Sequence, residues 1–383
     1  MKKKIWTLIS YILVSALSVA ITLGLVFRQM NGESKLDQLQ RLIENCYIEE
    51  ADPVLLTDAA AEAMIAATGD RWSYYIPANE YAAYLENSEN AYVGIGITIT
   101  VAHDGSGLQI MEVNSGSSAE EAGLQVDDVI TAIEGQSAAD MTTTEARNLV
   151  RGKEGTLVEL TLWRQGQTLT ISVIRRKVEV QVAAGVLLED NVGLVTIENF
   201  DDRCASESIA AIESLLEQGA DKLIFDVRNN PGGYAHELVK MLDYLLPEGE
   251  LFRTVDYRGK ESVDRSDADC LDIPMTVLVN GDSYSAAEFF AAALQEYGAA
   301  AVVGEKTTGK GHFQSTFQLN DGSAVALSIG KYFTPRGISL EGVGITPDVV
   351  VPVDRETADA IYYGQLPPEE DPQIQAALDV LNR

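Results

Sequence analysis

The sequence has little of the residue types that build metal centres and disulfide frameworks. Only three cysteines and three histidines occur in 383 residues, and they form neither a CxxC pair nor an HExxH motif. Because a zinc site needs such ligands at close spacing, no metal is predicted. The six residues are Cys46, Cys204, Cys270, His103, His236 and His312.

Positive charge is also scarce. The chain carries 28 lysines and arginines against 58 aspartates and glutamates, which gives a formal net charge of -30 at pH 7. Nucleic-acid binding needs clustered cations, so we expect no nucleic-acid partner. The apolar content of 46% is nevertheless that of a folded protein, and the length indicates two or three domains.

Long hydrophobic runs are absent except near the amino terminus, where three lysines precede an uncharged stretch from Ile5 to Phe27. As a helix this stretch would reach about 34 Å, enough to cross the hydrocarbon layer of a bilayer. We expect residues 1–27 to form a cytoplasmic tip and a single-pass plasma-membrane anchor, with the rest of the chain extracytoplasmic. A cleaved signal peptide is the alternative, because Ser18 and Ala20 make a small-x-small site.

The rest of the chain divides into four regions. Residues 28–86 carry helical patterns, residues 87–177 contain short strands and turns, and residues 356–383 form a helical tail. In residues 178–355 strands and helices alternate, which predicts a multidomain α/β protein with parallel strand pairs covered by helices. Within that region we expect strands at 193–197, 223–227, 275–279 and 300–303, and helices at 205–218, 236–246 and 286–297.

The first candidate for chemistry is Ser285, between a buried strand and a helix. There its hydroxyl lies beside free helix N–H groups, which can stabilise a developing negative charge. Ser285 and Glu288 also fit the Ser-x-x-Glu pattern of a capping box, and a plain cap is the commoner meaning of that pattern. The segment lacks GxSxG, so an α/β-hydrolase nucleophile elbow is not supported.

A glycine-flanked lysine, Lys310, follows the next apolar strand. Burial in a Gly-Lys-Gly turn would disfavour the ammonium form and lower the pKa, and a neutral amine can deprotonate a serine hydroxyl. Lys306 competes for this role, but it follows a glutamate and lacks flanking glycines. A phosphate-binding loop nearly fits, but Gly311 stands where Ser or Thr would hold magnesium, so a nucleotide site is not expected.

The third element runs from Asp226 to Gly233, where a strand enters an Asn-Pro-Gly-Gly turn. Two consecutive glycines let backbone N–H groups approach a reacting oxygen closely, as an oxyanion hole requires. An ordinary turn is the usual meaning of this sequence.

Together and in this order, the three elements resemble the carboxyl-terminal processing proteases, also called tail-specific proteases. The resemblance covers nearly the whole chain after the anchor and includes Tyr332–Pro335 and Gly342–Asp348. The spacing of 25 residues from Ser285 to Lys310 matches the pattern of this family, whereas the spacing to Lys306 does not.

This resemblance implies a Ser–Lys serine endopeptidase with a crotonase- and ClpP-like α/β protease core. Peptide bonds would be hydrolysed through an acyl-enzyme, without a metal or cofactor. The family often dimerises through its N-terminal helices and C-terminal region, so a homodimer is a further possibility. The implied site consists of Ser285 as nucleophile, Lys310 as general base, Gln314 to orient the lysine, and backbone N–H groups of Ala286 and of Gly232 or Gly233 as the oxyanion hole.

A glycine-bearing loop over 92–97 is followed by Ala122-Gly123-Leu124 and by Glu134-Gly135. With this series, residues 87–177 resemble bacterial PDZ domains. A glycine-bearing loop ahead of a strand can aim N–H groups at a terminal carboxylate, while the strand edge accepts the peptide. The lining is apolar, so we expect protein or peptide substrates with small or apolar C-terminal residues. Arg151, near the domain border, is hypothesised to couple tail binding to the dyad. The predicted peptide-binding residues are Tyr92, Val93, Gly94, Ile95, Gly96, Ile97, Leu149 and Arg151.

Two functions of other classes compete with this one. A catalytically inactive PDZ scaffold would only bind tails, but such a protein would be free to lose the dyad or Gln314. A Ser-His-Asp hydrolase would use His236 or His312 with Asp226, and its pH–rate profile would show a controlling group near ~6.5.

Overall fold

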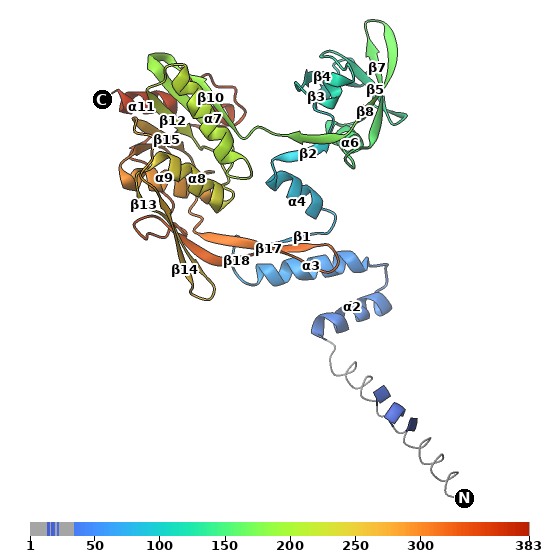
Figure 1. The fold of residues 1–383 in the computed structure, drawn as a ribbon. Coiled ribbons are helices and arrows are strands. Elements are labelled where there is room, and N and C mark those ends of the chain that lie inside the picture. Colours follow the sequence, from blue (N-terminus) through green and yellow to red (C-terminus); the bar gives the residue numbers. More distant parts are fainter. Residues whose placement is uncertain (1–13, 16, 20, 23–33, 383) are drawn as a thin grey trace, which may run out of the picture. The chain divides into compact units, whose positions relative to one another are not determined.

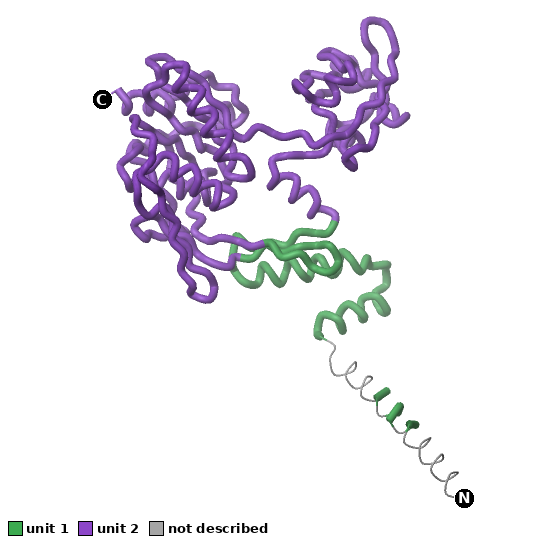
Figure 2. The backbone as a smooth tube through the Cα atoms, viewed as in Figure 1, with its two compact units in different colours: residues 1–78, 316–327 green, residues 79–315, 328–383 purple. Residues whose placement is uncertain are grey.

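The computed structural model describes residues 34–382 together with 14, 15, 17–19, 21 and 22 (Figure 1). The chain forms two compact units, one of residues 1–78 and 316–327 and the other of residues 79–315 and 328–383 (Figure 2). The anchor expected over residues 5–27 lies mostly outside the described residues. Among the residues that are described, no helix is both long and apolar enough to cross a membrane.

Residues 34–78 of the first unit contain two helices and a short strand. Ser34 begins the first helix with a capping box, and Asp52 caps the second. The strand pairs antiparallel with residues 324–326, and the Tyr75 hydroxyl donates to Asp58 at 2.7 Å, which joins the strand to the second helix. These elements are α2 (Lys35–Cys46), α3 (Pro53–Ala66) and β1 (Tyr74–Ile76).

Within the second unit, a six-stranded antiparallel sheet with two short helices forms the PDZ-like module. Ile110, Ile130 and Leu160, from three strands of this sheet, are completely buried in its core. A capping box at Thr142 begins one of these helices, and two of the strands form a hairpin whose turn is at Gln165. The elements in sheet order are β3 (Ile97–Val101), β4 (Leu108–Val113), β5 (Val129–Ile133), β7 (Leu157–Arg164) and β8 (Gln167–Ile174), with β6 (Gln136–Ser137), α5 (Ser118–Glu121) and α6 (Thr143–Val150).

Residues 91–101 form two strands separated by a glycine turn. Gly96 has φ 80°, in the left-handed region, and a Cβ there would lie 2.5 Å from Cβ of Ser117. The chain therefore turns between β2 (Ala91–Gly94) and β3. Strand β2 pairs with β9 (Arg176–Glu179), so the segments leading into and out of the module lie side by side.

The α/β core expected over residues 178–355 is built on a six-stranded sheet. All neighbouring strands in it are parallel except for the antiparallel pair at one edge, which confirms the expected parallel pairing. The strand order is β10 (Ala183–Leu187), β11 (Val192–Ile197), β12 (Lys222–Asp226), β15 (Met275–Val279), β16 (Ala300–Gly304) and β19 (Val349–Val350).

Helices cover both faces of this sheet (Figure 1). Alternate strand residues point to opposite faces, so Phe225 packs with one helical layer and Ile224 with the other. The C-terminal helix contributes Ile374 to the second layer. The larger layer holds α7 (Cys204–Glu217), α8 (Ala235–Leu245) and α9 (Ala286–Tyr297), the other α11 (Pro372–Leu381), and α10 (Arg355–Tyr362) precedes α11.

A second sheet in the core has no counterpart in the sequence prediction. Its five strands are β13 (Gly249–Asp256), β14 (Glu261–Ser266), β17 (His312–Gln318), β18 (Ala324–Phe333) and β1, which pairs with β18. Strand β17 follows directly on the loop that carries Lys310, so this sheet fixes the far end of that loop.

Candidate active site

Ser285 lies where β15 leads into α9, as the sequence predicted. Its backbone has φ 59° and ψ −125°, a combination that L-residues seldom adopt and that tends to persist at functional sites. Because α9 begins at Ala286, Ser285 stands at the positive end of the helix dipole. The residue is 7% exposed, which limits the access of water to it.

The carboxylate of Glu288 joins this junction to the loop that carries the lysine. Its Oε2 accepts the backbone N–H of Ser285 at 3.0 Å and the backbone N–H of Lys310 at 2.8 Å. Its Oε1 accepts the N–H of Gly309 at 2.7 Å and the hydroxyl of Thr307 at 2.5 Å. Because one oxygen binds both amides, the backbones of Ser285 and Lys310 cannot lie farther apart than these two bonds allow.

Glu288 is itself completely buried. Burial raises the pKa of this carboxyl above its ordinary value, while the hydrogen bonds from Lys310, Thr307, Gly309 and Ser285 offset part of that rise. A buried carboxyl with four donors acts as a rigid connector between two loops. The sequence showed only the local Ser-x-x-Glu pattern and missed this longer-range role.

Lys310 and Lys306 lie on the same loop in different surroundings. Lys310 is half-buried, whereas Lys306 is exposed. The Lys310 Nζ lies 5.7 Å from the centre of the Tyr284 ring, and the face of an aromatic ring attracts an ammonium group. The amine of Lys310 therefore lies near the residue that precedes Ser285.

The glycine turn lies directly against Ser285. A Cβ on Gly232 would be 2.7 Å from the Ser285 Cβ and 2.8 Å from the Ala286 nitrogen, so no side chain fits there. The Gly232 N–H already donates to Oδ1 of the fully buried Asn230 at 2.8 Å. Because the Gly232 N–H already has an acceptor, the N–H groups of Gly233 and Ala286 are the remaining candidates for the predicted oxyanion hole.

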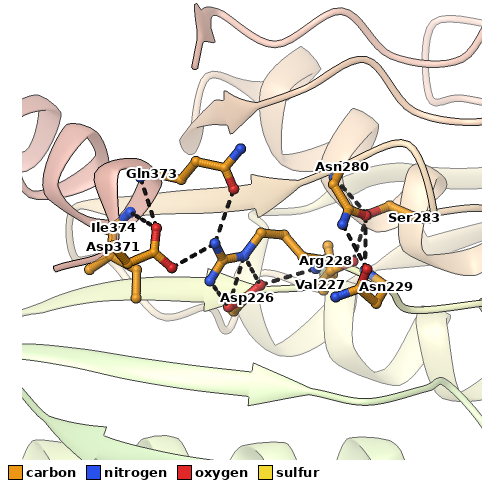
Figure 3. A network of polar contacts seen from close by, with 9 residues as sticks. All are labelled: Asp226, Val227, Arg228, Asn229, Asn280, Ser283, Asp371, Gln373 and Ile374. Atoms are coloured by element: carbon orange, nitrogen blue, oxygen red, sulfur yellow. Dashed lines mark hydrogen bonds and ion pairs between the residues drawn. The ribbon is translucent and has the colours of Figure 1, made fainter. Parts of the chain in front are cut away.

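Asparagine side chains tie the glycine turn to the loop that carries the serine (Figure 3). Asn280 Oδ1 accepts the Asn229 N–H at 2.9 Å, and Asn280 Nδ2 donates to Asn229 Oδ1 at 2.8 Å. Ser283 adds a bond from its hydroxyl to the Val227 carbonyl at 2.7 Å. These contacts hold the two loops in one arrangement.

Arg228 anchors the same turn to the C-terminal helix (Figure 3). Its guanidinium forms ion pairs with Asp226 at 2.6 Å and with Asp371 at 2.7 Å, and it donates to Gln373 at 3.0 Å. Burial would lower the pKa of Arg228, but the two carboxylates outweigh that effect and raise it. The charge is therefore retained inside the fold.

The other predicted polar residues have partners of their own. Gln314 Nε2 donates to the His312 carbonyl at 3.1 Å and to the Ser328 hydroxyl at 3.0 Å. His312 lies 3.8 Å from Glu341, and His236 is exposed and stacks on the ring of Tyr234. Asp226, the acid of the alternative triad, is bound by Arg228 through both carboxylate oxygens.

A groove of about 300 Å³ runs between β3 and α6 of the PDZ-like module. Arg151 borders it, with its guanidinium 4.5 Å from the centre of the Tyr92 ring and 3.3 Å from Glu86. Leu149 packs against the core of the module, and Arg147 and Val150 line the groove beside Arg151. Of the predicted peptide-binding residues, Tyr92, Gly94, Ile95, Gly96, Ile97 and Arg151 line the groove, while Val93 and Leu149 do not.

Comparison with known families finds two matches. Residues 191–351 match Peptidase family S41, and residues 109–164 match the PDZ domain family. The first match contains the serine, the lysine and the glycine turn, and the second lies within the module that carries the groove.

Curated proteins of similar sequence match over most of the chain. A carboxyl-terminal-processing protease of Picosynechococcus sp. is 32% identical, and the match covers 96% of this chain and 95% of that protein. The carboxy-terminal processing protease CtpA of Bacillus subtilis is 33% identical over 83% of this chain and 69% of its own. A solved putative S41 protease from Bacteroides fragilis shares the fold, with a TM-score of 0.52 at 15% identity, covering 90% of this chain and 97% of that one.

Proposed function

Because this chain belongs to peptidase family S41, as a serine protease of the carboxyl-terminal-processing family, we propose that Ser285 and Lys310 are its catalytic dyad. The reaction is hydrolysis of a peptide bond in proteins selected by their C-terminal tails. The observation that carries this proposal is the Glu288 carboxylate, one oxygen of which binds the backbone amides of both residues.

The proposed reaction proceeds through an acyl-enzyme. The neutral amine of Lys310 takes the proton of the Ser285 hydroxyl as the oxygen attacks the scissile carbonyl. The resulting oxyanion accepts hydrogen bonds from the Gly233 and Ala286 N–H groups, and the proton passes to the leaving amine. A water molecule, deprotonated by the same lysine, then attacks the ester and releases the acid product.

Substrate selection is assigned to the groove of the PDZ module. A terminal carboxylate fits N–H groups of the Gly94–Gly96 loop, and the apolar lining by Ile95 and Ile97 favours small or apolar terminal residues. Arg151 is proposed to couple tail binding to the dyad, as its place beside the groove suggests. If Arg151→Ala cleaves tailed and tail-less peptides at wild-type rates, this coupling role is wrong.

We further propose that the protease acts outside the cytoplasm and is held at the plasma membrane by a single helix over residues 5–27. The support is the run of 23 uncharged residues behind three lysines. A homodimer is part of the same proposal. Fractionation of cells into membrane and soluble parts, with and without residues 1–27, tests the anchor, and light scattering tests the dimer.

The dyad is tested with alanine variants assayed on a peptide that ends in an apolar residue. Ser285→Ala and Lys310→Ala should abolish cleavage, whereas the matched control Lys306→Ala should keep it, because Lys306 is exposed. Retention of activity by Ser285→Ala, or its loss in His312→Ala, would contradict the dyad. Peptide binding without cleavage by the wild type would instead favour the scaffold function.

A further inference from the structure

We propose that Asn90 and Asn199 form an amide pair that positions the oxyanion loop. Asn90 directly precedes β2, the strand that leads into the PDZ module. The oxyanion loop is defined here as residues 229–233. The inference rests on the proposed function, because it adds two positioning residues to the same reaction. Neither asparagine lies in the peptide groove or in the dyad.

The two side chains bind each other reciprocally. Asn90 Nδ2 donates to Asn199 Oδ1 at 3.0 Å, and Asn199 Nδ2 donates to Asn90 Oδ1 at 2.8 Å. Asn90 Nδ2 also donates to the Asp202 carbonyl at 3.0 Å. Asn90 is only 6% exposed, so a shift of its side chain would leave buried polar groups without partners. The pair therefore fixes the place where the chain leaves the core for β2.

Phe200, the residue after Asn199, connects the pair to the oxyanion loop. Asn199 Oδ1 also accepts the Asp201 N–H at 2.9 Å, which fixes the backbone on both sides of Phe200. The Phe200 N–H donates to the Gly232 carbonyl at 2.7 Å, and its carbonyl accepts the Tyr234 N–H at 2.8 Å. Phe200 thus holds the chain on either side of Gly233, whose N–H is assigned to the oxyanion hole.

The backbones of Phe200 and Gly233 are in tight contact. A Cβ at Gly233 would lie 2.3 Å from the carbonyl carbon of Phe200, so the two backbones are already at their closest approach. A movement of Phe200 must therefore displace the oxyanion loop. Because donors to an oxyanion act only at the correct distance, a displacement well below 1 Å lowers the rate.

Arg203 binds both of the chain segments that connect the PDZ module to the core. Its guanidinium donates to the carbonyls of Glu89 and Asn90, which precede β2, and to that of Val180, which follows β9. The Val180 N–H in turn donates to the Asn90 carbonyl at 2.8 Å. A motion of the module that pulls on either connection therefore acts on Asn90 and, through Asn199, on the oxyanion loop.

The test uses the full chain with three single variants, the double variant of Asn199→Ala with Asn90→Gly, and a matched control. Asn199→Ala removes the pair, and Asn199→Asp keeps the acceptor oxygen while losing the donor. Asn90→Gly removes the side chain but tolerates the positive φ of 47° at that position, and Asn191→Gly is the same substitution at another asparagine with positive φ. Each is assayed for kcat, KM, affinity for a peptide aldehyde that forms an oxyanion, and binding of a tail peptide to the groove.

We expect kcat to fall about 10- to 100-fold in Asn199→Ala and Asn90→Gly, with KM and tail binding unchanged. Aldehyde affinity should fall in parallel with kcat, Asn199→Asp should lie between wild type and Asn199→Ala, and Asn191→Gly should match wild type. The double variant should be no worse than the worse single variant, because both changes remove the same pair. Hydrogen exchange of the 229–234 peptide should be faster in the variants.

Wild-type kcat and wild-type exchange in Asn199→Ala and Asn90→Gly would overturn the amide pair, while an inactive Ser285→Ala would leave the proposed function standing. If the wild type itself does not cleave, the proposed function fails, and exchange of the 229–234 peptide still decides whether the pair positions the loop. A fall in kcat/KM of the asparagine variants without a loss of affinity for the aldehyde would also refute the positioning role.

Discussion

The strongest prediction concerns Glu288, whose carboxylate is expected to hold the two residues of the proposed dyad together. Glu288→Ala removes the acceptor of four donors, three backbone amides and one hydroxyl. Each buried donor left without a partner costs about 1–3 kcal/mol. The variant also no longer bears the cost of burying a carboxylate, which is several kcal/mol and offsets part of this loss. The free energy of unfolding should therefore fall by about 2–5 kcal/mol.

The effect on catalysis should exceed the effect on stability. With the shared oxygen gone, the Ser285 and Lys310 backbones lose the one acceptor that binds both of them, and a misplacement of 1 Å is enough to cost about 100-fold in rate. Glu288→Gln keeps the shape but presents an NH₂ group to two N–H donors, so it too should lose most of its kcat. The matched control is Glu305→Gln, a change of the same kind on the lysine loop.

Urea unfolding measures the stability, and kcat on the apolar-tailed peptide, at a temperature where each variant is folded, measures the chemistry. A Glu288→Ala protein that is folded and keeps a kcat close to that of wild type would refute the reasoning. So would a Glu288→Gln variant that is indistinguishable from Glu305→Gln.

Three further predictions follow from single side chains. Arg228→Lys should lower the free energy of unfolding in urea by about 1–3 kcal/mol, because lysine lacks the forked guanidinium that binds two carboxylates; an unchanged urea midpoint would contradict this. Gly232→Ala should abolish cleavage, because its Cβ would lie 2.7 Å from that of Ser285, and an active variant would show that the turn can move away. Burial, with a smaller contribution from a neighbouring aspartate, raises the pKa of Asp201 to about 7, so the folded protein holds a proton that the unfolded chain releases near pH 4. Stability should therefore fall as the pH rises from about 4 to 7, by up to about 4 kcal/mol, and Asp201→Asn should remove this slope in unfolding measured across that range.

Much of the core could be predicted from the sequence because its signals are local. The buried strands β12 and β15 are short apolar runs, and α8 and α9 follow them with helical periodicity, so the predicted positions came within one or two residues of those observed. The serine and lysine loops were found because strand ends and glycine turns mark them. The antiparallel sheet was missed because strands such as Glu261–Ser266 are polar and only partly buried, which gives no apolar alternation.

The contacts that organise the site could not be predicted in the same way. Glu288 binds an amide 22 residues further along the chain, and Arg228 pairs with a carboxylate 143 residues away. Nothing in the local pattern of either residue indicates such a partner, because a charged side chain near a turn or a helix start reads as solvated or as a cap. The asparagine pair at positions 90 and 199 could not be predicted for the same reason, since its two members are 109 residues apart in the sequence.

The Arg228 clamp also has a consequence for biosynthesis. Ser285 and Lys310 are made before Asp371, and at about 5–20 residues per second the ribosome needs several seconds to add the residues between Ser285 and Asp371. During that interval the guanidinium has no Asp371 to pair with, and one face of the central sheet lacks the cover that α11 provides. A nascent chain thus carries both residues of the proposed dyad before its core is complete, so we expect cleavage to begin only after α11 has docked.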